Sequence, residues 1–104
     1  MNSYVIYALE WPTGCYVGLT SDLGARLSKH YSQFKTGSHH CCEAQKIFYE
    51  HGFPKVEVVA WTKSKHKGLK LERQHMRTRN AVNSDGKAHI DLKARQRAFF
   101  KKIK

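Results

Sequence analysis

Apolar side chains dominate the start of the chain, and their spacing predicts two short strands. An extended segment over residues 3–9 has two apolar faces, one formed by Tyr4, Ile6 and Ala8 and the other by Val5, Tyr7 and Leu9. Residues 11–14 (Trp-Pro-Thr-Gly) predict a turn, and residues 14–19 predict the return strand. With residues 10–13 as the connection, Leu9 pairs with Gly14 and Tyr7 lies opposite Tyr16. Both phenols then share one face of the sheet.

A helical pattern follows the two strands. Residues 20–22 (Thr-Ser-Asp) offer N-caps for a helix whose apolar stripe comprises Leu23, Leu27, Tyr31 and Phe34. Arg26 and His30 are one turn apart and form the neighbouring stripe, at the edge between core and solvent. Residues 35–40 predict a polar loop.

The remaining segments complete a single small domain. They predict a second helix over 41–51, a third strand over 55–61, a third helix over about 64–80, and a short basic helix from Asp91 onward. The fold class is therefore α/β (α+β), with a small central three-stranded, mostly antiparallel sheet flanked by helices. Residues 1–83 form the domain, and residues 84–104 are a short basic extension packed on it or continuing it.

Charge is distributed unevenly along the chain. Residues 1–62 carry five basic and five acidic side chains, so the net charge of +11 lies entirely within residues 63–104. A cationic region beside a neutral platform is typical of nucleic-acid binding. A solvated basic surface or a membrane-surface patch is the alternative, but the sequence offers no apolar face for a membrane-surface helix.

Cysteine usage and the start of the chain favour an intracellular protein that is not secreted, in bacterial or host cytoplasm or nucleoid. Cys15, Cys41 and Cys42 are odd in number and two are adjacent, which disfavours a disulfide framework. No charged-then-apolar segment opens the sequence, and no run approaches the ~20 apolar residues of a membrane span.

Glu72 is the strongest candidate for chemistry. It is the only carboxylate among the basic residues of the third predicted helix. Leu69 at i−3 and Met76 at i+4 place it on the inward apolar stripe. An inward carboxylate needs a partner, a cation or a metal. The alternative to a metal is a structural salt bridge, for instance to Arg26.

The tripeptides Val-Ile-Tyr at residues 5–7 and Tyr-Val-Gly at 16–18, followed by Arg26, His30 and Glu72, resemble the signature of the GIY-YIG nucleases. The resemblance covers about residues 4–83 and implies that family's fold. It also implies that Glu72 is the single protein ligand of one divalent cation, Mg²⁺, with Mn²⁺ as a substitute.

Within that family the chain is most similar to the nuclease domains of phage intron-encoded homing endonucleases and related mobile-element nucleases. The loop over 35–40 and the helix ending in His-Gly carry this similarity. By that match His39 is the family's loop histidine, with His40 as the alternative. Asn83, or alternatively Asn80, is the family's asparagine after the metal-ligand helix.

Three positions depart from the family pattern. Val5 replaces the first glycine, Val17 is a conservative change, and Leu19 stands where some relatives carry a lysine.

The residue types predict a mechanism for phosphodiester hydrolysis. Arg26 contacts the scissile phosphate through its planar guanidinium. Tyr7 or Tyr16 orients the attacking water or takes its proton, although a phenol with a pKa near ~10 needs nearby positive charge to do so. His30 relays a proton or binds phosphate. Together with His39 and Asn83, which the resemblance implies, the catalytic candidates are Tyr7, Tyr16, Arg26, His30 and Glu72.

The predicted partner is duplex DNA, bound through its backbone by a monomer or weak dimer, with a recognition partner protein as a further predicted partner. The DNA-binding candidates are Lys63, Lys65, Lys67, Lys70, Arg73, Arg77, Arg79, Lys93, Arg95, Arg97, Lys101 and Lys102. The predicted function is a metal-dependent DNA endonuclease that nicks or cuts both strands, leaving a 5′-phosphate and a 3′-hydroxyl. The alternatives are a non-catalytic nucleic-acid-binding module on the same fold and a structure-specific repair or junction nuclease.

Overall fold

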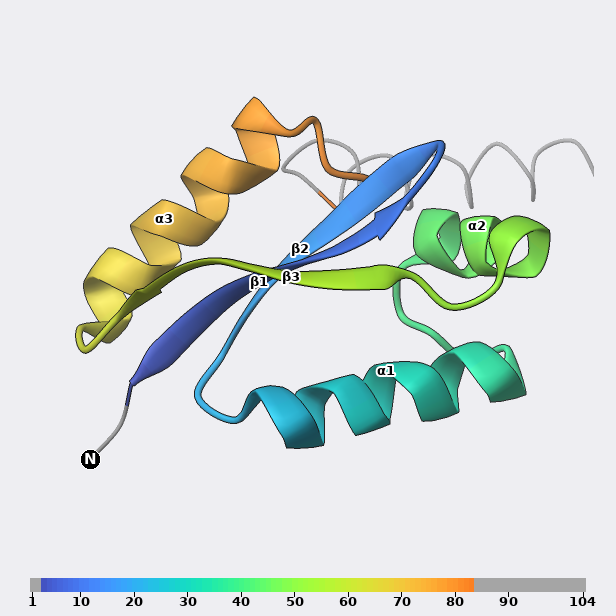
Figure 1. Cartoon of the computed structure of the whole chain (residues 1–104), viewed down its shortest axis with the longest axis horizontal. Helices are drawn as coiled ribbons and strands as arrows, with labels where there is room; N and C mark the ends of the chain where they lie inside the picture. Colours follow the sequence, from blue (N-terminus) through green and yellow to red (C-terminus); the bar gives the residue numbers. More distant parts are fainter. Residues whose placement is uncertain (1–2, 84–104) are drawn as a thin grey trace, which may run out of the picture.

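A three-stranded sheet forms the centre of the computed structural model, which describes residues 3–83 (Figure 1). Strand β1 (Tyr4–Trp11) lies in the middle, with β2 (Gly14–Thr20) on one side and β3 (Lys55–Thr62) on the other. Both pairings are antiparallel, and an irregularity between Ile6 and Tyr7 shifts the register of β1 against β3. The predicted fold class is confirmed. The predicted helix from Asp91 and the proposed extension over 84–104 lie outside the described residues.

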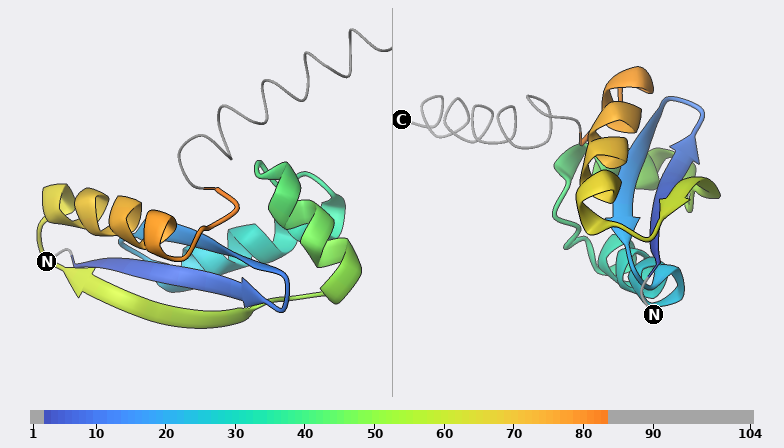
Figure 2. Two further views of the ribbon diagram at one scale, coloured as in Figure 1. Left: turned by 90° about the horizontal axis from the view of Figure 1, so that it is seen from above. Right: turned by 90° about the vertical axis from the view of Figure 1, so that its left-hand side faces the viewer.

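Three helices cover the sheet: α1 (Leu23–Thr36), α2 (Cys42–His51) and α3 (Lys65–Thr78). Tyr7 and Leu9 point to the face where α1 and α2 contribute Phe34 and Ile47 to the core. Ile6, the neighbour of Tyr7 in β1, points to the opposite face. Successive strand residues alternate between faces, so β1 supplies both halves of the core. Figure 2 shows the sheet between α3 and the pair α1 and α2.

The register of the β1–β2 hairpin differs from the prediction by two residues. Trp11 pairs with Gly14 across a two-residue turn, so Leu9, and not Tyr7, lies opposite Tyr16. The pleat has a period of two, so this shift keeps Tyr7 and Tyr16 on the same face. The prediction of a shared face is confirmed, although the predicted pairing of Leu9 with Gly14 is wrong.

The helix ends follow local sequence signals. The Asp22 side chain accepts a hydrogen bond from the Ala25 N–H at 3.1 Å and begins α1. At the other end, Gly37 adopts φ 74°, and its N–H lies against the last carbonyls of the helix. The helix therefore continues through Thr36, two residues into the predicted loop. In α3, Ser64 caps the first turn in the same way as Asp22.

Strand β3 is an edge strand with an open outer surface. Val58 and Trp61 are 52% and 62% exposed, so this strand is only partly covered. Among the described residues, the helices are too short and too polar to cross a membrane.

Candidate active site

Tyr7 reaches across the sheet because its cross-strand partner is glycine. Tyr7 pairs with Gly18, and the Tyr7 ring lies directly over the Gly18 Cα. A Cβ at position 18 would lie 2.7 Å from Tyr7 Cε1 and closer still to its hydroxyl. The glycine therefore lets the phenol pass over β2 and present its hydroxyl at the β2 side of the sheet.

Arg26 meets Tyr7 from helix α1. Its guanidinium Nη1 lies 3.5 Å from the Leu19 carbonyl oxygen, at the end of β2. The positive charge of the guanidinium acts on the Tyr7 hydroxyl and counters the effect of burial on the pKa of that phenol. The Asp22 cap sets the start of α1, and Arg26 follows one turn later, where its N–H closes the first backbone bond onto Asp22. The start of the helix thus positions the guanidinium beside the phenol.

Glu72 comes from helix α3 and acts on both tyrosines through its negative charge. One turn earlier, the buried Gly68 lets α3 approach the sheet, since a Cβ there would lie 3.1 Å from Leu19 Cδ1. The half-buried Glu72 shares its side of the helix with Gly68 and with Met76, which packs in the core. The predicted inward neighbour Leu69 is instead 45% exposed. The inward stripe of α3 is turned slightly from the prediction because Gly68 and Leu71 make the contact with the sheet.

Burial makes the hydroxyl groups of both tyrosines weaker acids than a free phenol. It raises the pKa of Tyr7 to about 12, against the lowering effect of the Arg26 charge and hydrogen bond. Burial also raises the pKa of Tyr16, and the neighbouring Tyr7, Cys41 and Glu72 raise it further. Both are neutral phenols at pH 7.

His30 lies deeper than the sequence predicts. It is 1% exposed, and both ring nitrogens are occupied: Nε2 lies 2.6 Å from the Tyr7 hydroxyl oxygen and Nδ1 lies 2.7 Å from His39 Nε2. The prediction that it sits at the edge between core and solvent is wrong, because its ring fills the space behind the two tyrosines. With both nitrogens occupied inside the protein, neither is left for a phosphate.

Both loop histidines belong to the site, in different positions. His39 is buried and stacks on Phe34 with ring centroids 4.2 Å apart. His40 is exposed, and its Nε2 lies 2.8 Å from the Tyr16 hydroxyl. Burial lowers the pKa of His30 to about 3 and that of His39 to about 4, with the adjacent His40 contributing to both shifts. The rings of His30 and His39 are therefore neutral at pH 7.

Asn83 contacts the sheet backbone. Its Oδ1 accepts from the Val17 N–H at 3.1 Å, and its Nδ2 donates to the Val17 carbonyl at 2.7 Å. This bidentate pair fixes the outer edge of β2 between Tyr16 and Gly18. The amide therefore supports the second tripeptide from behind. The alternative, Asn80, adopts φ 53° just after the end of α3.

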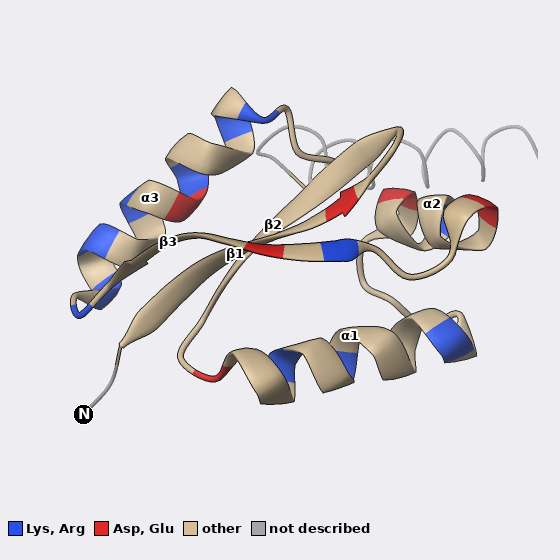
Figure 3. Ribbon diagram, viewed as in Figure 1, with Lys and Arg blue, Asp and Glu red and all other residues tan. Residues whose placement is uncertain are grey.

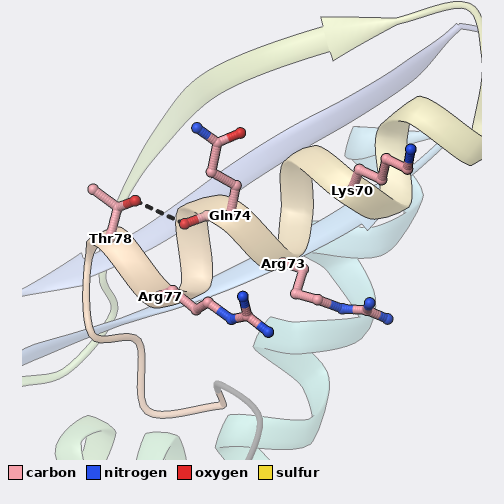
Figure 4. Close-up of a pocket in the computed structure, with 5 residues that line it drawn as sticks. All are labelled: Lys70, Arg73, Gln74, Arg77 and Thr78. Carbon is pink, nitrogen blue, oxygen red and sulfur yellow. Dashed lines mark hydrogen bonds between the residues drawn. The ribbon is translucent and has the colours of Figure 1, made fainter.

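Basic positions lie on both sides of the acidic position along the ribbon of α3 (Figure 3). The exposed basic residues in and just before α3 are Lys63, Lys65, Lys67, Lys70, Arg73 and Arg77. Lys70, Arg73 and Arg77 line one pocket of ≈ 280 Å³ together with Gln74 and Thr78 (Figure 4). The two arginines extend from the same side of the helix.

Arg79 differs from the other predicted DNA-binding residues. Its guanidinium forms ion pairs with Glu10 at 3.6 Å and Glu57 at 3.2 Å. These pairs direct it to the sheet, so we do not retain it as a phosphate contact. The remaining predicted contacts lie outside the described residues: Lys93, Arg95, Arg97, Lys101 and Lys102.

Three further residues of the site were not identified from the sequence. Lys29 and Gln33 line a pocket of ≈ 130 Å³ with Arg26, His30 and His40. Their spacing of three and seven residues from Arg26 is a helical signal that identifies them in retrospect. Gln45 holds the histidine loop, accepting from the His39 N–H at 3.1 Å and donating to the Phe34 carbonyl at 2.9 Å. No sequence pattern indicates that contact.

The donor set fits a hard divalent cation. A single carboxylate whose charge acts on two phenols offers oxygen and few protein ligands, and Mg²⁺ accepts such a site because it keeps several waters. Glu72 would be the protein ligand. The same cation would bring positive charge to the phenols, which burial keeps neutral.

Comparison with known families agrees with this geometry. A family model described as the GIY-YIG catalytic domain matches residues 3–87. No curated protein and no solved structure matches the chain. The match spans both tripeptides, Arg26, the histidine loop and Glu72. The chain therefore belongs to the GIY-YIG family, whose catalytic domain is a nuclease that hydrolyses phosphodiesters.

Proposed function

We propose that this protein is a metal-dependent DNA endonuclease that leaves a 5′-phosphate and a 3′-hydroxyl. The observation that carries the proposal is the convergence of four side chains from four elements: Tyr7 from β1, Tyr16 from β2, Arg26 from α1 and Glu72 from α3. A purely nucleic-acid-binding module has no need of a half-buried carboxylate whose charge acts on two phenols. For this reason we favour the enzyme over a non-catalytic module.

Each residue has a role in hydrolysis. Arg26 binds the scissile phosphate and offsets its charge with a planar pair of donors. Tyr7 first loses its own hydroxyl proton to solvent, and the resulting phenolate takes the proton of the attacking water; the Arg26 charge and the His30 ring lie at its oxygen. Its pKa near 12 means that the phenolate forms only when further positive charge reaches the site. Tyr16 is held by His40 and orients the water or the phosphate.

Glu72 holds the divalent cation that nucleases of this family generally use. When bound, that cation stabilises the negative charge on the leaving oxygen. We propose Mg²⁺, with Mn²⁺ as a substitute, because the donor set is oxygen-rich and sparse.

DNA binding is proposed through the exposed cations of α3. Lys70, Arg73 and Arg77 flank Glu72 on the same helix and would contact phosphates on either side of the scissile one. As one site cuts one strand, a monomer is expected to nick, and a double-strand break needs a second copy or a second event. A role in homing or interference by phage or mobile elements is proposed from the similarity of the histidine loop.

The test is plasmid relaxation by the wild type and Glu72→Ala, with and without Mg²⁺. Loss of the carboxylate should reduce the rate by at least ~100-fold, since charge stabilisation by a metal is worth several kcal/mol. Glu50→Ala is the matched control, because Glu50 is an exposed helical carboxylate on α2. A relaxed circle without linear product would support the monomeric nickase.

Equal metal-dependent rates for the wild type and Glu72→Ala would overturn the assignment of Glu72. Cleavage of flaps or four-way junctions with no cleavage of plain duplex would instead identify a structure-specific nuclease. Binding without cleavage of any of these substrates would identify a non-catalytic module.

A further inference from the structure

Three groups behind Tyr7 form a continuous hydrogen-bonded chain that ends at the Tyr7 oxygen. The Cys41 backbone N–H donates to His39 Nδ1 at 3.1 Å. His39 Nε2 then lies 2.7 Å from His30 Nδ1, and His30 Nε2 lies 2.6 Å from the Tyr7 oxygen. Both rings are buried, and no buried side-chain polar atom of residues 3–83 lacks a hydrogen-bond partner.

The backbone N–H sets the direction of every bond in this chain, because it can only donate. His39 Nδ1 must accept from it, so a neutral His39 carries its proton on Nε2. That proton points at His30 Nδ1, which must also accept, and a neutral His30 therefore carries its own proton on Nε2. The His30 proton then points at the Tyr7 oxygen.

The opposite direction fails at the backbone. If Tyr7 donated to His30, His39 would carry its proton on Nδ1, facing the Cys41 N–H at 3.1 Å. Two donors facing each other in a buried site leave both unsatisfied. A doubly protonated His39 would meet the same conflict, and burial already holds its pKa at about 4.

We infer that His39 is a positioning residue that fixes His30 as a hydrogen-bond donor to Tyr7. The hydroxyl proton of Tyr7 is then directed away from His30. When Tyr7 becomes a phenolate, the bond from His30 becomes charge-assisted and stabilises it. His30 is thus neither the base that takes the Tyr7 proton nor a phosphate ligand. The functional part of this inference rests on the proposed role of Tyr7, whereas the direction of the bonds does not.

Nitrogen-15 NMR of the histidine rings in the free protein tests the direction of the bonds. Two-bond proton–nitrogen correlations distinguish the two neutral tautomers at pH 7. We expect His30 and His39 both to carry the proton on Nε2. A proton on Nδ1 of either ring would overturn the inference, and this measurement needs neither substrate nor metal.

Two substitutions of His39 test the positioning role. His39→Phe keeps a ring stacked on Phe34 but removes the donor, so His30 should populate both tautomers and kcat should fall at least ~10-fold with KM little changed. His39→Gln places an amide N–H near the former Nε2 and should restore the His30 tautomer and much of kcat. His51→Phe, at the exposed end of α2, is the control for loss of an imidazole.

The outcomes separate this inference from the proposed nuclease. An unchanged His30 tautomer and kcat in His39→Phe would overturn the positioning role even if Glu72→Ala abolishes cleavage. Conversely, an inactive wild type with both protons on Nε2 would refute the nuclease and leave the direction of the hydrogen bonds intact.

Discussion

Gly18 determines how far Tyr7 can reach, although the two residues lie on different strands. Their pairing puts the Tyr7 ring over a Cα that has no side chain. The glycine of the second tripeptide is therefore explained by the tyrosine of the first. No turn or positive φ is involved at this position.

At the residue scale we predict that Gly18→Ala separates Tyr7 from Arg26. The new methyl group would occupy the path of the phenol, so the ring must move. Overpacking of this kind costs about 1–3 kcal/mol in the free energy of unfolding. A displacement of the reacting group by about 1 Å lowers kcat by about 100-fold.

Gly24→Ala is the matched control for that substitution. Gly24 is an exposed position in α1, and a Cβ there would lie 3.8 Å from Asp22 Oδ1. Alanine should stabilise the helix by up to about 1 kcal/mol and leave kcat unchanged. Urea titration and single-turnover cleavage measure both effects, and full activity in Gly18→Ala would refute the explanation of Gly18.

At the scale of elements, one side of α3 packs against the sheet and another side carries exposed cations. Gly68 and Leu71 hold one side against the sheet, and Lys70, Arg73 and Arg77 stand on the exposed side. The carboxylate of Glu72 lies between these sides. A helix can separate such tasks because neighbouring residues point about 100° apart around its axis.

We predict that the exposed side of α3 supplies about three phosphate contacts. The triple substitution of Lys70, Arg73 and Arg77 by alanine should reduce the slope of log Kobs against log[salt] by about 2–3. Binding is measured in EDTA over about 50 to 300 mM salt, so that no cleavage occurs. Alanine at Lys35, Lys46 and Lys55 removes the same charge from exposed positions elsewhere.

The two triple variants together show whether the salt dependence comes from contacts of α3 with phosphates or from the total charge of the protein. If only the net charge mattered, the slope of log Kobs against log[salt] would fall by the same amount in both variants. A wild-type affinity that does not change with salt would exclude backbone contacts altogether.

At the scale of the whole molecule, two buried neutral histidines link stability to pH. Their pKa values of about 3 and 4 lie below the unfolded value of 6.5. Between those values the unfolded chain binds protons that the folded chain does not. The free energy of unfolding should therefore be greatest above pH 6.5 and fall as the pH drops toward 4.

The free energy of unfolding is expected to decline by up to about 1.4 kcal/mol per pH unit for each histidine as the pH falls. Urea midpoints between pH 7 and pH 4.5 measure it. The decline should be shallower in His39→Phe and unchanged in His51→Phe. A wild-type midpoint that stays constant over this range would show that the rings are not buried in neutral form.

The sequence predicted the types and order of the elements well, and their boundaries to within a few residues. Asp22, Ser64 and Gly52 are local signals whose effect does not depend on distant contacts. The predicted register of the hairpin was wrong because a two-residue connection and a four-residue connection give the same alternation of side chains between the two faces. The alternation alone was enough to place both phenols on one face.

The sequence by itself determined the family, the three-stranded sheet with its helices, and the types of side chain that phosphodiester hydrolysis would need. Those features depend on local periodicity, caps and the identities of residues. Only the tertiary structure decided that His30 is buried, that Arg79 pairs with Glu10 and Glu57, and that Asn83 binds the edge of β2. The direction of the hydrogen bonds behind Tyr7 also depends on one backbone N–H that is distant in sequence. Burial, ion pairing and hydrogen-bond direction depend on groups brought together from separate elements, and no local pattern encodes such contacts.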